Sequence, residues 1–486
     1  MVQTSEALGR EYLKNLFETK KKHDTGNVLD VLPFLSKRTK AIRGQFNKVL
    51  GEYIRNICEI KLNDKAFNDK EFVTSTESNE LSEHIASNVD YNNEDDVHDF
   101  VRFLDQYLFN QEDIKPIHPF LFNYIEIETD KNKKLKNEFG KYGQFMSETF
   151  VKDNPEIKAI FNNKESEDIL TELILDKLNG VEESSKNTQN QVGNKKVKQY
   201  QSLLGEFTRI YQEDILYLSK YKDYFLTSFP LLTHYYVFMY ACQLILKFEQ
   251  FTTADMERVQ PLYFALEWES MSRRRKATGE LEGFKYVKEK SINLFPHIHT
   301  ISQLSHNSLN NRGEYDDTLE FIPYGKLYDL IKGKGEEYEA AFLSEVNQWV
   351  KDYLELRKLP PQESKAVQSL PEAFQLLFNC VKEGVSTEVA KKFGENIGDL
   401  GANQFLKTRG SYGQIFNIKH DFLLLLTAVS VKDKRIPLND LFKELEKRGV
   451  AFDRYSKKEI ISLFDDLNIL DKKSDSGDAQ YVKPIL

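Results

Sequence analysis

Cysteine is scarce in this sequence. Its 486 residues include three cysteines, Cys58, Cys242 and Cys380, and these stand far apart. This spacing excludes a disulfide framework and a zinc site built on a Cys-x-x-Cys pair. The first residues, MVQTSEALGREYLKNLF, also lack the charged and then apolar pattern of a signal peptide. We therefore expect a soluble protein with buried, reduced thiols in the cytoplasm.

Motifs that grip phosphates or carry catalysis are absent as well. No GxxxxGK[ST] loop occurs, and the nearest glycine cluster, residues 332–336, lacks both the spacing and the Ser or Thr. Neither GxSxG nor HExxH is present. The chain is therefore predicted not to hydrolyse ATP by itself, and we expect no catalytic residue, no cofactor and no metal site.

Two patterns keep weaker catalytic interpretations open. His297 and His299, with His306 behind them, would share one face of a strand, as two metal ligands must. Ordinary histidines in a partly buried loop are the favoured interpretation. Two Glu-x-Lys triplets, residues 59–61 and 156–158, match part of the acid-and-lysine set of Mg²⁺ nucleases. A metal-dependent nuclease is thus the least favoured hypothesis.

One apolar run tests the expectation of a soluble protein. Residues 224–246 carry no formal charge and are long enough to span a bilayer. The run nevertheless contains Pro230, His234 and Gln243, and no second candidate span exists to pair with it. A helix buried on all sides within a large helical domain is therefore expected.

Apolar and aromatic residues are abundant, at 40% and 12% of the chain, which is enough for real cores. Apolar steps of three and four residues predict helices, for example from near Ser36 and from about Glu337 to Lys358. Residues 122–128 alternate like a short strand. We predict a mainly α, multi-domain protein with an N-terminal helical domain (1–180), a flexible polar linker (181–198), a central helical domain (199–406) and a C-terminal domain (407–486).

The C-terminal domain has the clearest pattern. Residues 407–486 carry more basic than acidic side chains, although the whole chain has a formal net charge of −9. The predicted order is a helix at 420–431, a short apolar step at Ile436, a helix closed by Gly449, a helix opened by a capping box at Ser456, and a hairpin around 475–478. This order predicts a winged helix-turn-helix.

Basic residues in that domain are candidates for contact with DNA. Lys457 and Lys458 begin the predicted recognition helix and Arg454 precedes it, while Lys472 and Lys473 lie on the first wing strand. Asp465 and Asp466, at the end of the same helix, oppose such contact along its whole length.

Two further basic sets lie elsewhere in the chain. Arg273, Arg274 and Arg275 form the densest run. Another set is predicted on the outer face of the helix near Ser36: Lys37, Arg38, Lys40, Arg43, Lys48 and Arg55. Phosphate contacts would give affinity through counterion release. A solvated surface or an acidic protein partner explains these sets equally well.

The closing segment, LLLLTAVSVKDKRIPLNDLFKELEKRGVAFDRYSKKEIISLFDDLNILDKKSDSGDAQYVKPIL, resembles the DptG (also called DndG) proteins, notably at KKSDSGDAQYV. The early VLPFLSKRTK adds to the resemblance. These proteins belong to DNA phosphorothioation-dependent restriction systems, which mark host DNA with sulfur and attack DNA without the mark. The resemblance implies F and H components as partners that carry the ATPase machinery, and it supplies no catalytic residue.

Three function hypotheses follow. The first is a non-catalytic DNA-binding and bridging subunit of an anti-phage restriction complex, with duplex DNA and the F and H components as partners and no membrane contact. The second is a docking scaffold whose winged helix contacts a partner subunit and not DNA. The third is the metal-dependent nuclease.

Overall fold

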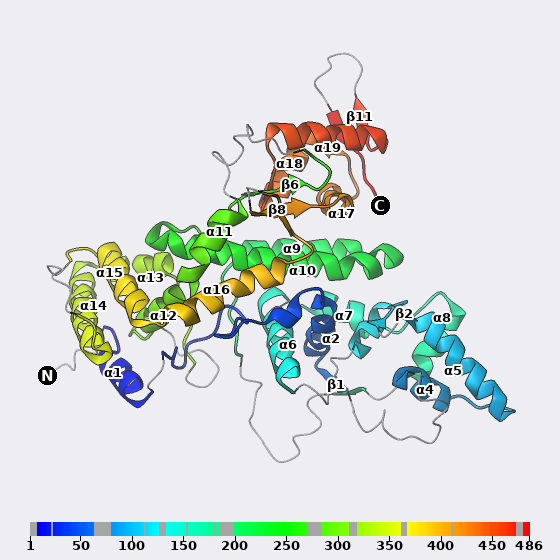
Figure 1. Cartoon of the computed structure of the whole chain (residues 1–486), viewed down its shortest axis with the longest axis horizontal. Coiled ribbons are helices and arrows are strands. Elements are labelled where there is room, and N and C mark those ends of the chain that lie inside the picture. The colour runs from blue at the N-terminus through cyan, green and yellow to red at the C-terminus, as the bar shows by residue number, and fades with distance from the viewer. Residues whose placement is uncertain are drawn as a thin grey trace. The chain divides into compact units, whose positions relative to one another are not determined.

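The computed structural model of the chain is mainly helical (Figure 1). It describes residues 7–20, 23–62, 79–110, 113–125, 133–151, 154–178, 181–183, 198–270, 283–310, 318–360, 367–410, 413–472 and 480–486. These form two compact units. Unit 1 comprises residues 1–44, 195–210 and 234–486, and unit 2 comprises residues 45–194 and 211–233.

Unit 2 is built around helix α2, which packs against α6, α7 and η2. Its helices and strands are α2 (Phe46–Cys58), β1 (Ile60–Leu62), α4 (Glu80–Ser87), α5 (Glu94–Leu108), β2 (Phe109–Asn110), β3 (Asp113–Ile114), η2 (Pro119–Tyr124), α6 (Lys133–Met146), η3 (Ser147–Val151), α7 (Pro155–Asn162), α8 (Ile169–Lys177) and β4 (Val181–Glu183). Apolar residues of α4, α5, η2 and α8 form a shared core, which includes Leu104, Leu108 and Leu175.

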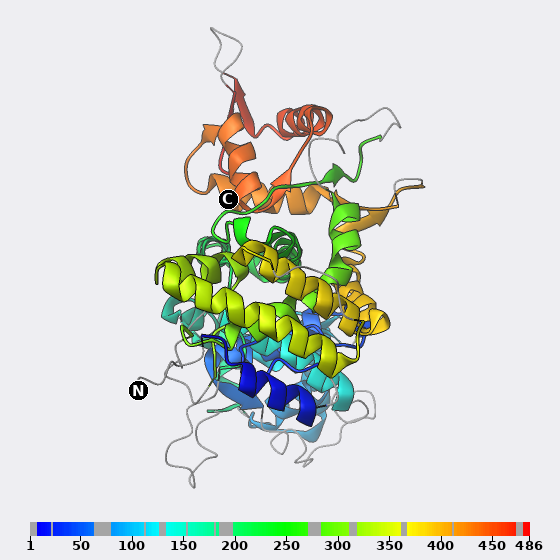
Figure 2. The same cartoon turned by 90° about the vertical axis from the view of Figure 1, so that its left-hand side faces the viewer.

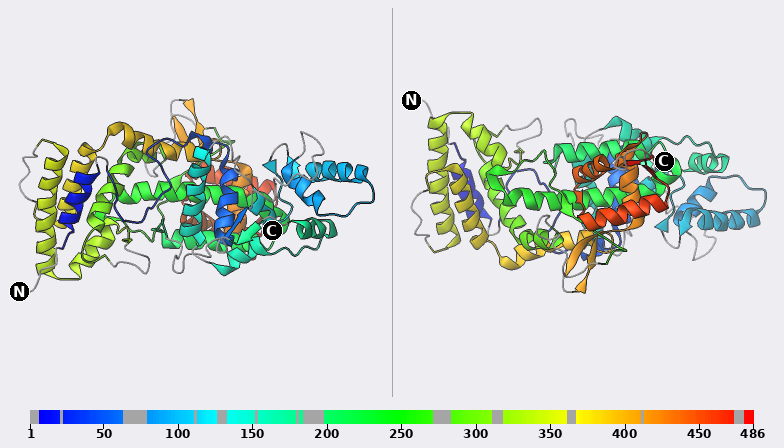
Figure 3. Two further views of the ribbon diagram at one scale, coloured as in Figure 1. Left: turned by 90° about the horizontal axis from the view of Figure 1, so that it is seen from below. Right: turned by 90° about the horizontal axis from the view of Figure 1, so that it is seen from above.

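Unit 1 before residue 402 is a helical body. It contains α1 (Arg10–Thr19), η1 (Lys40–Ile42), η4 (Phe251–Thr253), β5 (Leu262–Tyr263), β6 (Ala265–Leu266), α11 (Phe284–Lys290), η6 (Ser291–Asn293), α12 (Leu294–Ser305), α13 (Tyr324–Lys332), α14 (Glu336–Arg357), α15 (Leu370–Gly384) and α16 (Thr387–Gly401). Helix α14 packs against α1 and α15, and the three lie side by side in Figures 2 and 3. The predicted helix from Glu337 to Lys358 is therefore confirmed within one residue at each end.

The division between the units falls inside two helices, α9 (Gly205–Leu218) and α10 (Lys222–Glu249). Helix α10 contains the uncharged run and is long and apolar enough to cross a membrane by length and composition alone. Its most apolar window is 89% buried, so the prediction of a buried helix is confirmed. Pro230 lies within this helix. The three cysteines are free and buried, as predicted.

Several predicted elements need correction. Residues 119–124 form the 3-10 helix η2 and not a strand, because Pro119 occupies the first turn and the ring of His118 caps it by accepting from Phe120 N at 3.2 Å. Residues 126–128 lie outside the described part. The helix expected near Ser36 begins at Phe46, after the short η1 turn.

The C-terminal part of unit 1 begins with the strands β7 (Leu406–Thr408) and β8 (Gln414–Ile418). It continues through α17 (His420–Val431), β9 (Ile436–Pro437), α18 (Leu438–Lys447), β10 (Val450–Ala451), α19 (Arg454–Asp466), β11 (Leu470–Lys472) and β12 (Gln480–Val482). Strand β12 pairs antiparallel with both β11 and β9, with Leu470 opposite Val482 and Tyr481 opposite Pro437. This three-stranded sheet packs on α18, and β11 lies beside α19 (Figure 2).

This segment is joined to the rest of unit 1 through residues 262–266. Strand β5 pairs in parallel with β10, and β6 pairs in parallel with β8. Strands β6, β8 and β7 form one sheet in that order. The predicted boundary at residue 406 therefore falls at the start of β7, within a sheet that also contains residues 265–266. Likewise, the first 44 residues belong to unit 1, whereas the predicted N-terminal domain ran to residue 180.

Candidate nucleic-acid interface

The first turn of α19 is set by an aspartate cap. Asp453 accepts hydrogen bonds from Tyr455 N at 2.9 Å and Ser456 N at 2.8 Å, which satisfies two backbone donors at the start of the helix. The helix therefore starts at Arg454, and the predicted cap at Ser456 is wrong. Ser456 lies inside the helix and is fully buried.

Ser456 instead fixes this turn to residues 265–269. Its hydroxyl donates to the buried Glu269 carboxylate, at 3.0 Å from Oε2, and Oε1 of Glu269 accepts from Leu266 N at 3.0 Å. Arg409 binds the same strand end, because its guanidinium donates to the carbonyl oxygens of Leu266 at 2.6 Å and Glu269 at 2.8 Å. Buried hydrogen bonds of this kind hold one orientation of the helix start.

Three predicted cations lie together on this turn. Arg454 is exposed, stacks on the ring of Tyr455 at 4.7 Å and donates to its hydroxyl at 2.6 Å. The ammonium of Lys457 lies 4.8 Å from the centre of the Phe442 ring on α18, and Lys458 is exposed. No acidic side chain in the described part of the chain forms an ion pair with any of these three cations. Their charges therefore stay available to an anionic partner.

The charge order along α19 runs against helix stability. The first turn is cationic, whereas Asp465 and Asp466 lie exposed at the last turn. A helix dipole favours anions at its amino end and cations at its carboxyl end, by about 0.3–1 kcal/mol for each exposed charge. The start of α19 thus carries cationic side chains, while the Asp453 carboxylate already occupies two of its backbone donors.

The sheet beside α19 carries further cations, and sequence reasoning missed two of them. Arg435 stacks over the Tyr481 ring at 5.4 Å and lies 3.6 Å from Asp471, which also pairs with Lys483 at 3.4 Å. Lys483 donates to the carbonyl oxygen of Asn468 at 2.9 Å. These contacts depend on the register in which β12 pairs with β11 and β9, and the sequence pattern does not give that register.

The remaining predicted DNA contacts are only partly described. Lys472 ends strand β11, but nothing is described of its side chain, and Lys473 lies outside the described residues. Arg273, Arg274 and Arg275 also lie outside them.

The other predicted basic face does not exist as a single helical surface. Arg38 and Arg43 precede α2, and both guanidinium groups bind the buried carboxylate of Asp399. Arg55 lies on α2 but is buried, and it donates to the carbonyl oxygens of Asn123 at 2.7 Å and Ile125 at 2.9 Å. The prediction of one basic face failed because the charge pattern along the sequence shows neither the burial of a side chain nor its ion-pair partner.

The histidine pattern belongs to a helix and not to a strand or loop. His297 and His299 lie buried in α12, where residues two apart point to different faces. His297 Nε2 donates to Glu249 Oε1 at 3.3 Å. Burial acts to raise the pKa of Glu249, but hydrogen bonds from His297, Lys290 and Asn293 outweigh it and lower the pKa to about 2.

The nuclease-like triplets are brought together, but as an ion pair. Lys158 lies on α7, and its ammonium is 2.6 Å from Oε2 of Glu59, which ends α2 in a left-handed conformation. Within the ranges that the structure describes, no group of three or more His, Cys, Asp or Glu residues is placed to hold a metal ion.

Comparison with known proteins adds no identification. No protein-family model matches the chain, and no curated protein sequence matches it significantly.

Proposed function

We propose that this chain is a non-catalytic DNA-binding subunit of a phosphorothioation-dependent restriction complex. The C-terminal segment would bind duplex DNA, while partner subunits of the F and H kind hydrolyse ATP. The observation that carries the DNA-binding part is the first turn of α19. Three cations gather there without an acidic partner among the described residues, on a helix start that buried hydrogen bonds hold in place. The resemblance of the closing segment supports the restriction system.

The element order supports a winged helix in this role. Helices α17, α18 and α19 are followed by the paired strands β11 and β12, with β9 as the third strand, and this is the order of elements expected of a winged helix-turn-helix. In that arrangement α19 is the recognition helix, whose amino end approaches the groove. Asp465 and Asp466 would then lie at the end directed away from the phosphates.

The test is a titration of fluorescent duplex DNA with the full-length protein at several salt concentrations. With six or more phosphate contacts, affinity should fall by about 10³-fold between 50 and 200 mM salt. Lys458→Glu should weaken binding to all sequences alike, because a phosphate contact carries no base information. Lys351→Glu, an exposed charge reversal on α14, is the matched control and should bind nearly as well as the wild type.

The same variant separates binding from folding. A carboxylate at position 458 would stand four residues after Arg454, where opposite charges attract and like charges repel, so Lys458→Glu should unfold at equal or higher temperature than the wild type. Weaker DNA binding by a more stable protein cannot result from unfolding. Binding that Lys458→Glu leaves unchanged would exclude this turn as the DNA contact.

A docking scaffold is the second candidate, and two exposed apolar side chains favour it. Tyr455 is 45% and Leu467 46% exposed, at opposite ends of α19. Aromatic and apolar residues are enriched at the centre of protein interfaces. If Tyr455→Ser and Leu467→Ser abolish assembly with the partner subunits while DNA affinity stays intact, this surface docks protein.

A further inference from the structure

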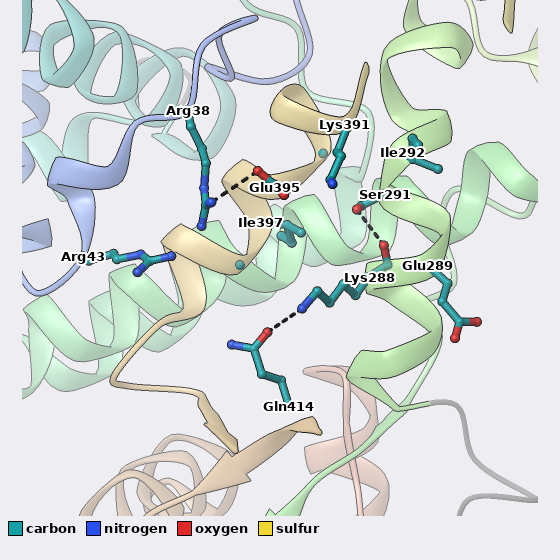
Figure 4. A pocket seen from close by; sticks show the side chains of 12 residues that line it. Arg38, Arg43, Lys288, Glu289, Ser291, Ile292, Lys391, Glu395, Ile397 and Gln414 are labelled. Atoms are coloured by element: carbon teal, nitrogen blue, oxygen red, sulfur yellow. Dashed lines mark hydrogen bonds and ion pairs between the residues drawn. The ribbon is translucent and has the colours of Figure 1, made fainter. Parts of the chain in front are cut away.

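Unit 1 contains a pocket of about 400 Å³ that the proposed function does not use (Figure 4). Helix α16 forms one wall, α11 and η6 form another, and residues 38–43 and strand β8 complete it. Its charged lining consists of four cations, Arg38, Arg43, Lys288 and Lys391, and two carboxylates, Glu289 and Glu395.

A buried carboxylate orients the two arginines. Asp399 is fully buried, and its oxygens accept from Arg38 Nε at 2.6 Å and Arg38 Nη2 at 2.9 Å, and also from Arg43 Nε. The backbone beside them is fixed as well, because Thr39 N donates to the buried Asn396 Oδ1 at 2.9 Å. The guanidinium groups are therefore held in place before any ligand arrives.

The two arginines keep unused donors, although two carboxylates balance their charge. Asp399 supplies one negative charge for two arginines, and Glu395 lies 3.2 Å from Arg38 Nη1. Arg43 uses only Nε for Asp399, which leaves its two terminal nitrogens without a partner in the described part of the chain.

The two lysines give the pocket its excess of positive charge. The ammonium of Lys288 donates to the neutral amide of Gln414 at 2.9 Å. Lys391 is exposed and forms no ion pair with a described acidic residue. Glu289 does not offset these cations, because Figure 4 shows its carboxylate turned away from Arg38, Lys391 and Lys288.

From this geometry we infer that the pocket between α16 and α11 binds the phosphate group of a small ligand, up to the size of a mononucleotide. The fork of N–H donors on arginine matches phosphate oxygens, and the volume lies in the range of small-molecule sites. Ile292 and Ile397 supply an apolar surface for the remainder of the ligand. A duplex is too wide to enter such a volume, so this site is separate from the proposed DNA contact on α19.

Gly398 provides a way to block the pocket. It lines the cavity, and a Cβ built on it meets nothing within 4 Å. Gly398→Leu should therefore fill the space from the helix without a backbone clash. Gly398→Ala adds one methyl group at the same position and is the matched control.

The experiment is calorimetric titration of the full-length protein with inorganic phosphate and, separately, with adenosine 5′-monophosphate, at constant ionic strength. We expect one site for each chain. Arg43→Gln and Gly398→Leu should each weaken binding at least tenfold, while Gly398→Ala binds as the wild type does. Tighter binding of the nucleotide than of inorganic phosphate would assign the nucleotide as the ligand class, and equal affinities would assign the free anion.

Absence of binding by either compound would overturn the inference, as would equal binding by the wild type, Arg43→Gln and Gly398→Leu. Thermal melting of each variant verifies that it is folded. Because Lys458 lies outside this pocket, Lys458→Glu should bind phosphate normally. Loss of DNA binding and loss of phosphate binding are thus separate results.

Discussion

At the scale of single residues, equal formal charges have unequal roles. Arg38 and Arg43 share one buried carboxylate, Asp399, whereas Arg55 is itself buried against backbone carbonyl groups. Their side chains were predicted to lie together on the outer face of one helix. A charge pattern along the sequence gives the sign of each residue, but its burial depends on partners that are distant in the chain.

Arg55 should therefore matter for stability and not for binding. Arg55→Ala would leave the buried carbonyl of Asn123 without its donor and Glu52 without its cation. We expect a loss of about 1–3 kcal/mol in the free energy of unfolding, the cost of leaving a buried acceptor without its donor. Urea denaturation measures this loss. Lys48→Ala, on the same helix, should change stability by less than about 0.5 kcal/mol.

At the scale of secondary structure, the sequence predicted elements with a strong apolar stripe. Helix α14 buries Phe342, Val346 and Trp349 as expected, and α17 spans the predicted residues 420–431. Prediction failed where a single hydrogen bond or a single proline sets the start or the type of an element. Helix α19 begins before Ser456 because Asp453 caps it, and residues 119–124 form a 3-10 helix that begins with Pro119 where a strand was expected.

The candidate sites were predictable to different degrees. Lys457 and Lys458 lie near the start of α19, as predicted, although the helix begins at Arg454 and not after Ser456. The phosphate pocket could not be foreseen, because it depends on Asp399, which is more than 350 residues from Arg38 and Arg43 in the chain. The alternation of apolar and polar residues and the helix-capping signals depend on residues close in sequence, so they give no information on contacts between residues so far apart.

Two glycines of α16 offer a matched pair at this scale. A Cβ on Gly394 would lie 2.4 Å from the carbonyl oxygen of Ser291, whereas a Cβ on Gly398 meets open space. Gly394→Ala should destabilise the protein by about 1–3 kcal/mol through overpacking. Gly398→Ala should stabilise it by about 0.5–1 kcal/mol, because alanine loses less conformational entropy in a helix. Thermal melting of both variants gives the comparison, and equal shifts would contradict close packing of α16 on η6.

At the scale of the whole molecule, unit 1 is assembled from stretches far apart in the chain. Glu345 on α14 accepts from Leu8 N at 2.5 Å, and Arg10 pairs with Asp352 at 2.9 Å. His23 shares a hydrogen bond of 2.7 Å with the Tyr353 hydroxyl. These contacts hold residues 8–23 against α14 within unit 1.

Acid should destabilise this unit through its buried histidines. Burial lowers the pKa of His23 to about 3, and those of His234 and His299 to about 4. In the unfolded chain each histidine has a pKa of about 6.5. Between pH 6.5 and pH 4 these histidines are therefore protonated in the unfolded state and neutral in the folded state. The stabilising contribution of neutral histidine is complete above pH 6.5 and is lost as pH falls through this window.

The expected slope is up to about 1.4 kcal/mol per pH unit for each such histidine. Urea denaturation between pH 5 and pH 7 measures it, in a range above the titration of Glu249, whose pKa is lowered to about 2. His234→Gln should flatten the slope, because glutamine does not titrate and its amide can still donate to the carbonyl oxygen of Leu400, as His234 Nε2 does at 2.7 Å. If His234→Gln and the wild type lose stability equally on acidification, the buried histidines are not the source of the acid sensitivity.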